Sequence, residues 1–148
     1  MKKASRTDMC NCFAARQAAR HITRFYEREM ADAKLTSAQF SILVLLDENE
    51  DMSMNALAER MNMDRTTLLR AVKPMQRDGL VNSRRQKEGL GDPRSHALNI
   101  TSSGAKRLTE AVGLWVVAQR KLESAIGRAR AARLRDDLHA VSQMGIVV

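Results

Sequence analysis

The sequence predicts a mainly α-helical protein with a small β-hairpin, and three observations support this fold class. Two short amphipathic helical patterns, residues 53–61 and 64–73, are separated by a break at 62–64, which is typical of two helices held at a steep angle. After Gly79 the apolar period falls to two, as in a pair of strands. Long helical patterns flank this unit on both sides. The order is that of a winged helix-turn-helix with N- and C-terminal helical extensions.

Capping residues mark the starts of the second, third and fourth helices. A helix is expected over about residues 8–32, and either Thr36 or Ser37 caps the second helix. Ser53 is expected to cap the third helix and Asp64 the fourth. The side-chain oxygens of such residues accept the free N–H groups of a first helical turn.

The fourth helix and the hairpin after it form the rest of the central unit. Pro74 lies inside the fourth helix, where it removes an N–H and crowds the carbonyl of Arg70. We therefore expect the helix to kink there, or its regular part to end there. The hairpin, called the wing below, is expected as a strand at residues 81–86, a tip at 87–94 and a return strand at 95–100.

Two further helices are expected after the wing, and they predict a homodimer. Thr101, Ser102 or Ser103 caps a helix that runs to about Ile126, and a last helix covers about residues 129–144. Their apolar residues alternate spacings of four and three, a heptad-like seam. One chain offers too little apolar surface to cover them; the alternative is a monomer with the first helix packed along the fifth. The expected interface residues are Phe13, Leu122, Ile126, Leu134, Leu138 and Val141.

The charge distribution points to nucleic acid. The chain of 148 residues has a formal net charge of +8. From Arg65 to Arg94, eight basic residues against three acidic ones give +5, so most of the excess lies in the fourth helix and the wing. A solvated charged face is the alternative explanation. The coincidence of charge with this fold favours double-stranded DNA as the partner.

Composition also excludes several classes. No apolar run approaches the ~20 residues that span a bilayer, and the charged N-terminus lacks the apolar stretch of a secretory signal. We therefore expect a cytoplasmic protein without a membrane partner. His21, His96 and His139 are scattered, so no metal site and no cofactor are indicated. Catalytic residue patterns are also lacking, so an enzyme is not expected.

The candidate DNA contacts follow from the way this fold docks. The fourth helix enters the major groove with its N-terminus first, where arginine can bond a guanine bidentately and threonine can contact a thymine methyl or a phosphate. Arg94 would enter the minor groove. Asp92 either orients Arg94 through a charge-assisted pair or only forms the turn before proline. The candidates are Ser53, Arg65, Thr66, Thr67, Arg70, Lys73, Arg84, Lys87, Asp92 and Arg94.

These motifs resemble those of the MarR family, the dimeric winged-helix transcription factors of prokaryotes. The family shares an Asp-x-Arg wing tip and a Leu-Thr-x-x-Gly segment before a long helix. This chain has Asp92-Pro93-Arg94 and then Ile100-Thr101-Ser102-Ser103-Gly104, so Ile100 replaces the leucine. Segments 57–60 and 77–81 also fit the family. The resemblance implies one MarR-like domain over residues 1–148, with a DNA-binding lobe at 36–101 and dimerisation helices at 8–32 and 102–146.

The resemblance also implies a function and its regulation. A two-fold dimer suits a pseudo-palindromic operator, and we expect a repressor that is released by a small ligand. Many relatives bind small aromatic or phenolic compounds in a cleft between the dimerisation helices and the DNA-binding lobe. His21, Tyr26 and Trp115 are candidate effector contacts by position only, and each is also a common core or interface residue. Other relatives sense oxidants through cysteine, for which Cys10 and Cys12 are the candidates, although in a helix they would point about 200° apart. A nonspecific nucleic-acid binder is a further alternative.

Overall fold

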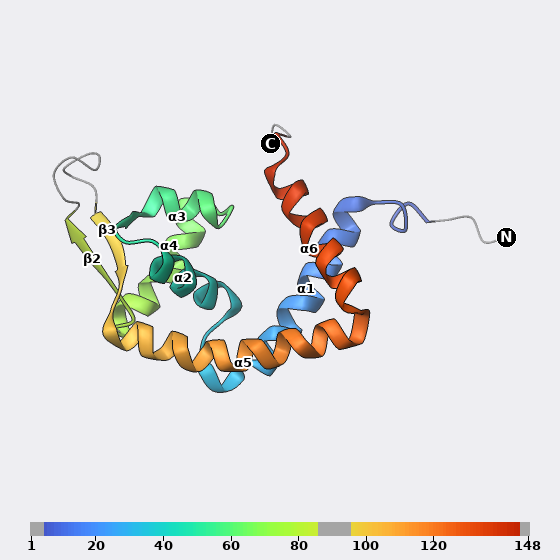
Figure 1. Cartoon of the computed structure of the whole chain (residues 1–148). Coiled ribbons are helices and arrows are strands. Elements are labelled where there is room, and N and C mark those ends of the chain that lie inside the picture. The colour runs from blue at the N-terminus through green and yellow to red at the C-terminus, as the bar shows by residue number, and fades with distance from the viewer. Residues whose placement is uncertain (1–4, 86–95, 146–148) are drawn as a thin grey trace.

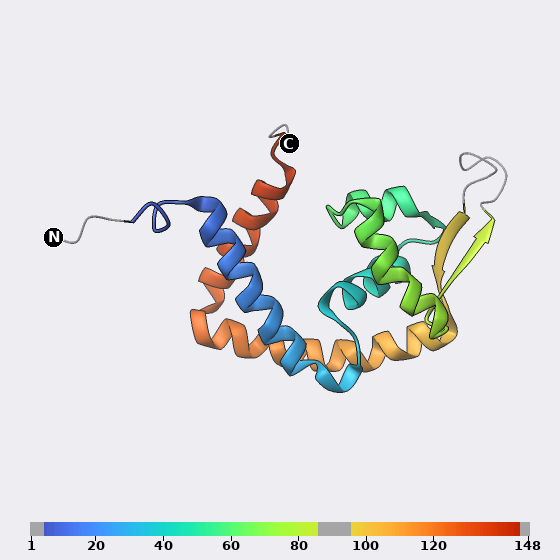
Figure 2. The ribbon, with the colours of Figure 1, turned by 180° about the vertical axis from the view of Figure 1, so that it is seen from behind.

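A long helix connects the two halves of the molecule (Figures 1 and 2). The structure is a computed structural model that describes residues 5–85 and 96–145. Helix α5 (Ser102–Ile126) runs along one side, with the wing and helices α2–α4 at its start and α1 and α6 at its end. The other elements are α1 (Asn11–Glu29), the short 3-10 helix η1 (Ala31–Ala33), α2 (Ser37–Glu48), β1 (Met52–Ser53), α3 (Met54–Arg60), α4 (Arg65–Arg77), β2 (Val81–Arg85), β3 (His96–Ile100) and α6 (Arg128–Gln143).

The expected winged helix-turn-helix with flanking helices is confirmed, and so are its helix caps. Thr36, Ser53, Asp64 and Thr101 each accept a hydrogen bond from the backbone N–H three residues later. Thr36 also forms a reciprocal capping box with Gln39. Helices α2, α3, α4 and α5 thus begin where side-chain chemistry places their starts.

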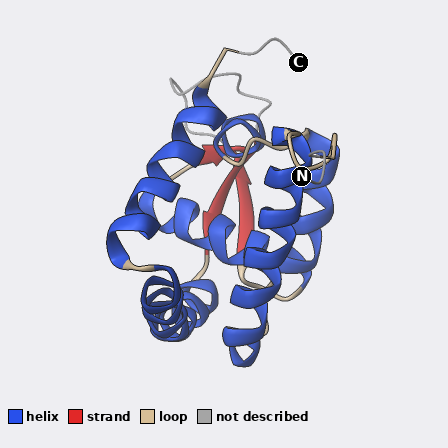
Figure 3. Ribbon diagram, turned by 90° about the vertical axis from the view of Figure 1, so that its right-hand side faces the viewer, coloured by secondary structure: helices blue, strands red, loops and turns tan. Residues whose placement is uncertain are grey.

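The sheet contains a strand that was not expected from the sequence. Its order is β1-β3-β2, and both pairings are antiparallel, with Met52 opposite Leu98 and Val81 opposite Ile100. Figure 3 shows the strands enclosed by helices. A two-residue strand such as β1 is too short to show a period of two. Its place beside β3 is decided by tertiary pairing alone.

Pro74 does not end α4. α4 continues past Pro74 to Arg77, so the expectation that its regular part ends at the proline is wrong. The N–H that proline lacks would serve the carbonyl of Arg70. Arg70 lies on an exposed face of α4, where water can satisfy that carbonyl.

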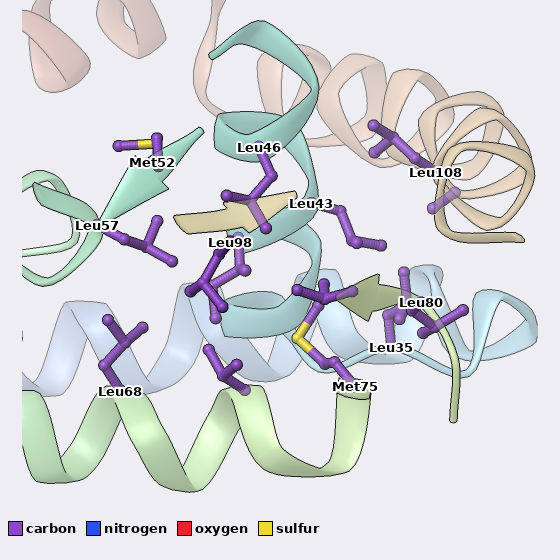
Figure 4. Packing of buried hydrophobic residues seen from close by; sticks show 14 of the residues in the cluster. Leu35, Leu43, Leu46, Met52, Leu57, Leu68, Met75, Leu80, Leu98 and Leu108 are labelled. Atoms are coloured by element: carbon purple, nitrogen blue, oxygen red, sulfur yellow. The ribbon is translucent and has the colours of Figure 1, made fainter. Parts of the chain in front are cut away.

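The hydrophobic core lies within the wing half of the molecule (Figure 4). Leu43 from α2, Leu57 from α3, Leu68 and Met75 from α4, and Leu98 from β3 are fully buried. Their packing holds the third and fourth helices against the sheet, and so fixes the angle at which α4 is presented.

Helices α1 and α6, in contrast, bury almost nothing. α1 has no buried residue, and in α6 only Ala131 is buried. Phe13, Leu138 and Val141 are about half exposed, at 47%, 50% and 61%. In the described part of the chain, no helix is both long and apolar enough to cross a membrane.

Candidate nucleic-acid interface

The candidate interface is formed by the starts of α3 and α4 together with the wing strands. In Figures 1 and 2 the strands β2 and β3 lead from the start of α5 towards the same end of the lobe as α3. A hollow of about 310 Å³ lies between these elements. Its lining residues are Ser53, Met54, Asn55, Arg65, Leu69, Gln76, Ser83, His96 and Leu98. The expected helix and the described strands of the hairpin therefore lie next to one concave surface.

Arg65 is held in place by a residue from the preceding helix. Its guanidinium Nη1 donates a hydrogen bond to Oδ1 of Asn55 at 2.9 Å. This bond crosses the turn between α3 and α4 and leaves the other guanidinium donors available. Because Asn55 fixes the side chain before any ligand arrives, less side-chain entropy is lost on binding.

The first turn of α4 has a second polar clamp. Asp64 accepts the Thr67 N–H at 2.8 Å and the Thr67 hydroxyl at 2.5 Å. These bonds hold the pKa of the Asp64 carboxyl below its ordinary value, and the bond from the Thr67 side chain is the largest cause. The hydroxyl proton of Thr67 is thus already used, so towards DNA this residue offers its methyl group and an acceptor oxygen.

The pKa of Asp64 gives a pH-dependent prediction for Asp64→Asn. A carboxyl with a lowered folded-state pKa stabilises the fold above its unfolded pKa, and the contribution disappears as the pH falls through the folded value. Asparagine caps a helix equally well and does not titrate. The thermal midpoint of the wild type should therefore be higher than that of the variant near neutral pH. The difference between the two midpoints should vanish towards pH 2. If the difference between the two midpoints stayed constant with pH, the stabilising role of the Asp64–Thr67 hydrogen bonds would be contradicted.

The remaining DNA candidates are placed as follows. Thr66, Arg70 and Lys73 are exposed on α4, and Arg84 is exposed on β2. Ser53 is half-buried, and its hydroxyl caps α3 by accepting the Ala56 N–H at 3.1 Å. Lys87, Asp92 and Arg94 lie outside the described residues.

A second cavity lies between α1, α2 and α5 and contains two of the three expected effector contacts. It measures about 250 Å³ and is lined by Ile22, Thr23, Tyr26, Met30, Ser37, Phe40, Ser41 and Trp115. The rings of Phe40 and Trp115 are nearly parallel, with centroids 6.5 Å apart. His21 is exposed on α1 and is not in this lining. Sequence reasoning missed Ser37, Phe40 and Ser41 as lining residues, because in α2 they look like ordinary helix-start and core positions.

Tyr26 also lies against an apolar groove between α1, α5 and α6. The groove, of about 230 Å³, includes Leu122, Ile126, Leu134 and Leu138, which are four of the six expected interface residues. The Tyr26 hydroxyl donates a hydrogen bond to Gln119 of α5. Burial is the main cause that raises the pKa of this hydroxyl.

Cys10 and Cys12 are both exposed free thiols at the start of α1. Cys10 is the N-cap of the helix, and its Sγ accepts the Phe13 N–H at 3.4 Å. Cys12 lies within the first turn. No three His, Cys, Asp or Glu side chains in residues 5–85 and 96–145 gather as a metal site.

Comparison with known proteins agrees with this geometry. The model of the MarR family matches residues 35–89. The organic hydroperoxide resistance transcriptional regulator of Bacillus subtilis (strain 168) is 29% identical over 103 residues, which are 70% of this chain and 68% of that protein.

Two solved DNA-bound structures are also similar. The M. tuberculosis transcriptional regulator MosR, in complex with DNA, is 32% identical, with a TM-score of 0.78 over 90% of this chain and 94% of that one. The transcriptional repressor CouR, bound to a 23-mer DNA duplex, is 24% identical, with a TM-score of 0.84 over 97% and 99% of the two chains, a likeness that shows the shared fold. Given the match to MosR over nearly the whole of both chains, the protein described here belongs to the MarR family of transcriptional regulators.

Proposed function

We propose that this chain is a homodimeric repressor that binds a pseudo-palindromic operator and is released by a small ligand. The observation that carries the proposal is the first turn of α4, where Asn55 holds Arg65 while Thr66 and Arg70 remain exposed. This is the part of a helix-turn-helix that reads base edges in the major groove. A regulator of this kind acts where the chromosome is, so we place it in the cytoplasm and assign it no catalytic role.

The test is selection of genomic fragments by the purified full-length protein, followed by footprinting of the enriched sites. A protected, two-fold related sequence that survives competition with random duplex supports the proposal. Equal affinity for random duplexes at the same salt concentration would instead establish a nonspecific binder, because phosphate contacts do not depend on sequence. Transcription from the selected promoter, with and without the protein, then separates a repressor from an activator.

The exposed apolar surface of α6 supports the dimer. Leu134, Leu138 and Val141 lie along one stripe of the helix and are 37%, 50% and 61% exposed in the single chain. A second copy of the chain would cover this stripe and the adjoining groove, since symmetric pairing joins the same patch on both subunits. Two copies would present two α4 helices to successive major grooves about 34 Å apart.

The double substitution Leu134→Asp and Leu138→Asp should separate the subunits. Burying two carboxylates in an apolar interface is strongly unfavourable. The expected result is a monomer in sedimentation analysis and a loss of operator affinity of about a hundredfold or more, because binding through two linked sites gains 10²–10⁴ over one.

Ala140→Asp is the matched control on the same helix. Ala140 is exposed and lies outside the stripe, 200° around the helix from Leu138 and 100° from Val141. This variant should remain a dimer and bind DNA as the wild type does. A dimer that persists in the double variant would show that the subunits pair through another surface.

Cysteine-based redox control is the second candidate mode of regulation. Its support is the exposure of both thiols, together with the similarity to the organic hydroperoxide resistance regulator. A hydroperoxide would oxidise one thiol to a sulfenic acid and be reduced to the alcohol. Loss of DNA binding on peroxide treatment, restored by a thiol reductant and absent in Cys10→Ser with Cys12→Ser, would support this mode. Unchanged DNA binding would remove it.

A further inference from the structure

The hollow between α3, α4 and the wing strands has an apolar part and an exposed polar part. Met54, Leu69 and Leu98 form the apolar part, and all three are buried or half-buried. The exposed lining residues come one each from α3, α4, β2 and β3, and they are Asn55, Arg65, Ser83 and His96. Each of these four side chains can donate a hydrogen bond. The exposed part of the hollow is thus a group of donors from four elements.

His96 lines the hollow because side chains alternate along β3. His96 and Leu98 are two residues apart, so their side chains lie on the same face of the sheet. At Leu98 this face is buried in the core, whereas at His96 it is exposed. The row of core-facing positions on β3 therefore ends in an ionisable side chain at the exposed part of the hollow.

The charge of the hollow is positive, and it increases when His96 is protonated. Among the described residues that line it, none is acidic and Arg65 is the only permanent cation. Arg85, the register partner of His96 on β2, is a further basic residue at this position of the sheet. His96 itself forms no hydrogen bond or ion pair with the other described residues. A histidine cation in such surroundings is stabilised by a bound anion.

The anion that reaches this place in a DNA complex is a phosphate of the backbone. α4 is expected in the major groove and the tip of the wing in the minor groove. One sugar-phosphate strand separates two neighbouring grooves of a duplex, so this strand passes between α4 and the strands β2 and β3. The hollow lies at this crossing. Arg65 keeps free guanidinium N–H groups beside its bond to Asn55, so it can donate to the same phosphate.

We propose that this hollow holds a backbone phosphate of bound DNA and that His96 binds this phosphate as the imidazolium. The inference rests on the proposed DNA-binding function, to which it adds a contact that sequence reasoning missed and a dependence on pH. Histidine is the side chain that changes its charge between about pH 5 and 8. Affinity for DNA should rise as the pH falls through this range, because a bound phosphate favours the protonated form and binding then takes up protons.

The test measures the binding of labelled duplexes to the full-length protein by fluorescence anisotropy, at about pH 6.0 and about pH 7.5 and at one ionic strength. The duplexes are the selected operator and its scrambled sequence. Both should bind about tenfold more tightly at the lower pH, because a hydrogen bond from a charged group replaces a neutral one. The salt dependence of binding should also be steeper at the lower pH, by about one unit per subunit. A phosphate contact carries no sequence information, so both duplexes should respond equally.

Two substitutions of His96 separate its charge from its capacity to donate. His96→Gln keeps a donor but cannot be protonated, so at both pH values its affinity should equal that of the wild type at the higher pH. His96→Arg is charged at both pH values, so its affinity should stay at the level of the wild type at the lower pH. Thermal midpoints at both pH values establish that each variant is folded.

His21→Gln is the matched control. His21 is also exposed, but it lies on α1 and does not line the hollow. This variant should respond to pH as the wild type does, on the operator and on the scrambled duplex.

Three results would overturn the proposal. A pH response that persists in His96→Gln would place the titrating group elsewhere in the protein. A response on the operator alone would mean that His96 contacts a base rather than a phosphate. Equal affinity of the wild type at both pH values would mean that the imidazolium contributes nothing, while the proposed DNA-binding function would stand. Failure to bind either duplex at both pH values would contradict that function and this inference together.

Discussion

Gly104→Ala is expected to destabilise the protein by about 3 kcal/mol or more, at the upper end of what overpacking costs. A Cβ added at Gly104 would lie 2.1 Å from the backbone oxygen of Leu80 and 2.8 Å from Cγ1 of Ile100. A backbone carbonyl cannot rotate away as a side chain can. The same oxygen accepts the Thr101 N–H at 3.0 Å, so moving it would break the bond that joins the end of the wing to the segment after α4. Urea denaturation should show a lower midpoint with an unchanged slope.

Gly113→Ala is the matched control for this prediction. Gly113 lies in the same helix, and nothing lies within 4 Å of the Cβ that alanine would add. Alanine is the better helix former by about 0.8–1.0 kcal/mol, so this variant should be at least as stable as the wild type. If both variants unfolded at the same urea concentration, the close approach of α5 to Leu80 would be refuted.

The features that could be predicted from the sequence are those that depend on local chemistry. Ser53 and Asp64 stand directly before apolar-periodic segments, so the starts of α3 and α4 follow from capping alone. For α2 and α5 the sequence contains two or three neighbouring hydroxyl residues that could each be the N-cap. Only the folded backbone shows that Thr36 and Thr101 are the caps. Residues at such positions satisfy the free N–H groups of a helix within three residues of chain.

The features that could not be predicted join distant parts of the chain. Asn99 of β3 accepts the Asp51 N–H and donates to its carboxylate, each at 3.0 Å, which fastens the wing to the turn before β1. Asp51 has a φ of +54°, and neither this conformation nor its partner shows in any period of the sequence. The Asn55–Arg65 bond crosses a turn in the same way. Such pairs depend on tertiary packing, which one sequence does not display.

The cavity between α1, α2 and α5 shows the same division. Tyr26 and Trp115 could be named because large aromatic residues in the flanking helices stand out by position. Ser37 lines the same cavity but could not be named from the sequence, because its burial without a hydrogen-bond partner in the described part of the chain results from packing and not from its residue type. His21 stands in the same helix as Tyr26, but it is exposed rather than part of the lining. Helix α1 therefore contains both exposed and cavity-lining positions, and only its packing against α2 and α5 shows which is which.

Arg70→Ala should weaken binding to the selected operator by about 1–3 kcal/mol per half-site, which is the cost of losing a bidentate base contact. Arg70 is exposed in the second turn of α4 and has no hydrogen bond or ion pair with the described residues, so its guanidinium is available. The loss should be concentrated at one base position of each half-site. Fluorescence anisotropy with a set of single-base operator variants measures this, since the Arg70→Ala protein should no longer discriminate at that position.

Arg84→Ala separates base readout from simple loss of charge. Arg84 is also exposed, but it lies on the wing strand β2, where the expected partner is a phosphate. Its removal should weaken operator and scrambled DNA alike and lower the salt dependence by about one unit per subunit. Arg70→Ala removes the same charge, so the two variants differ only in the place from which the charge is taken. Equal losses on both DNAs for both variants would mean that α4 does not lie in the major groove, and the assignment of sequence readout to its first turns would have to be abandoned.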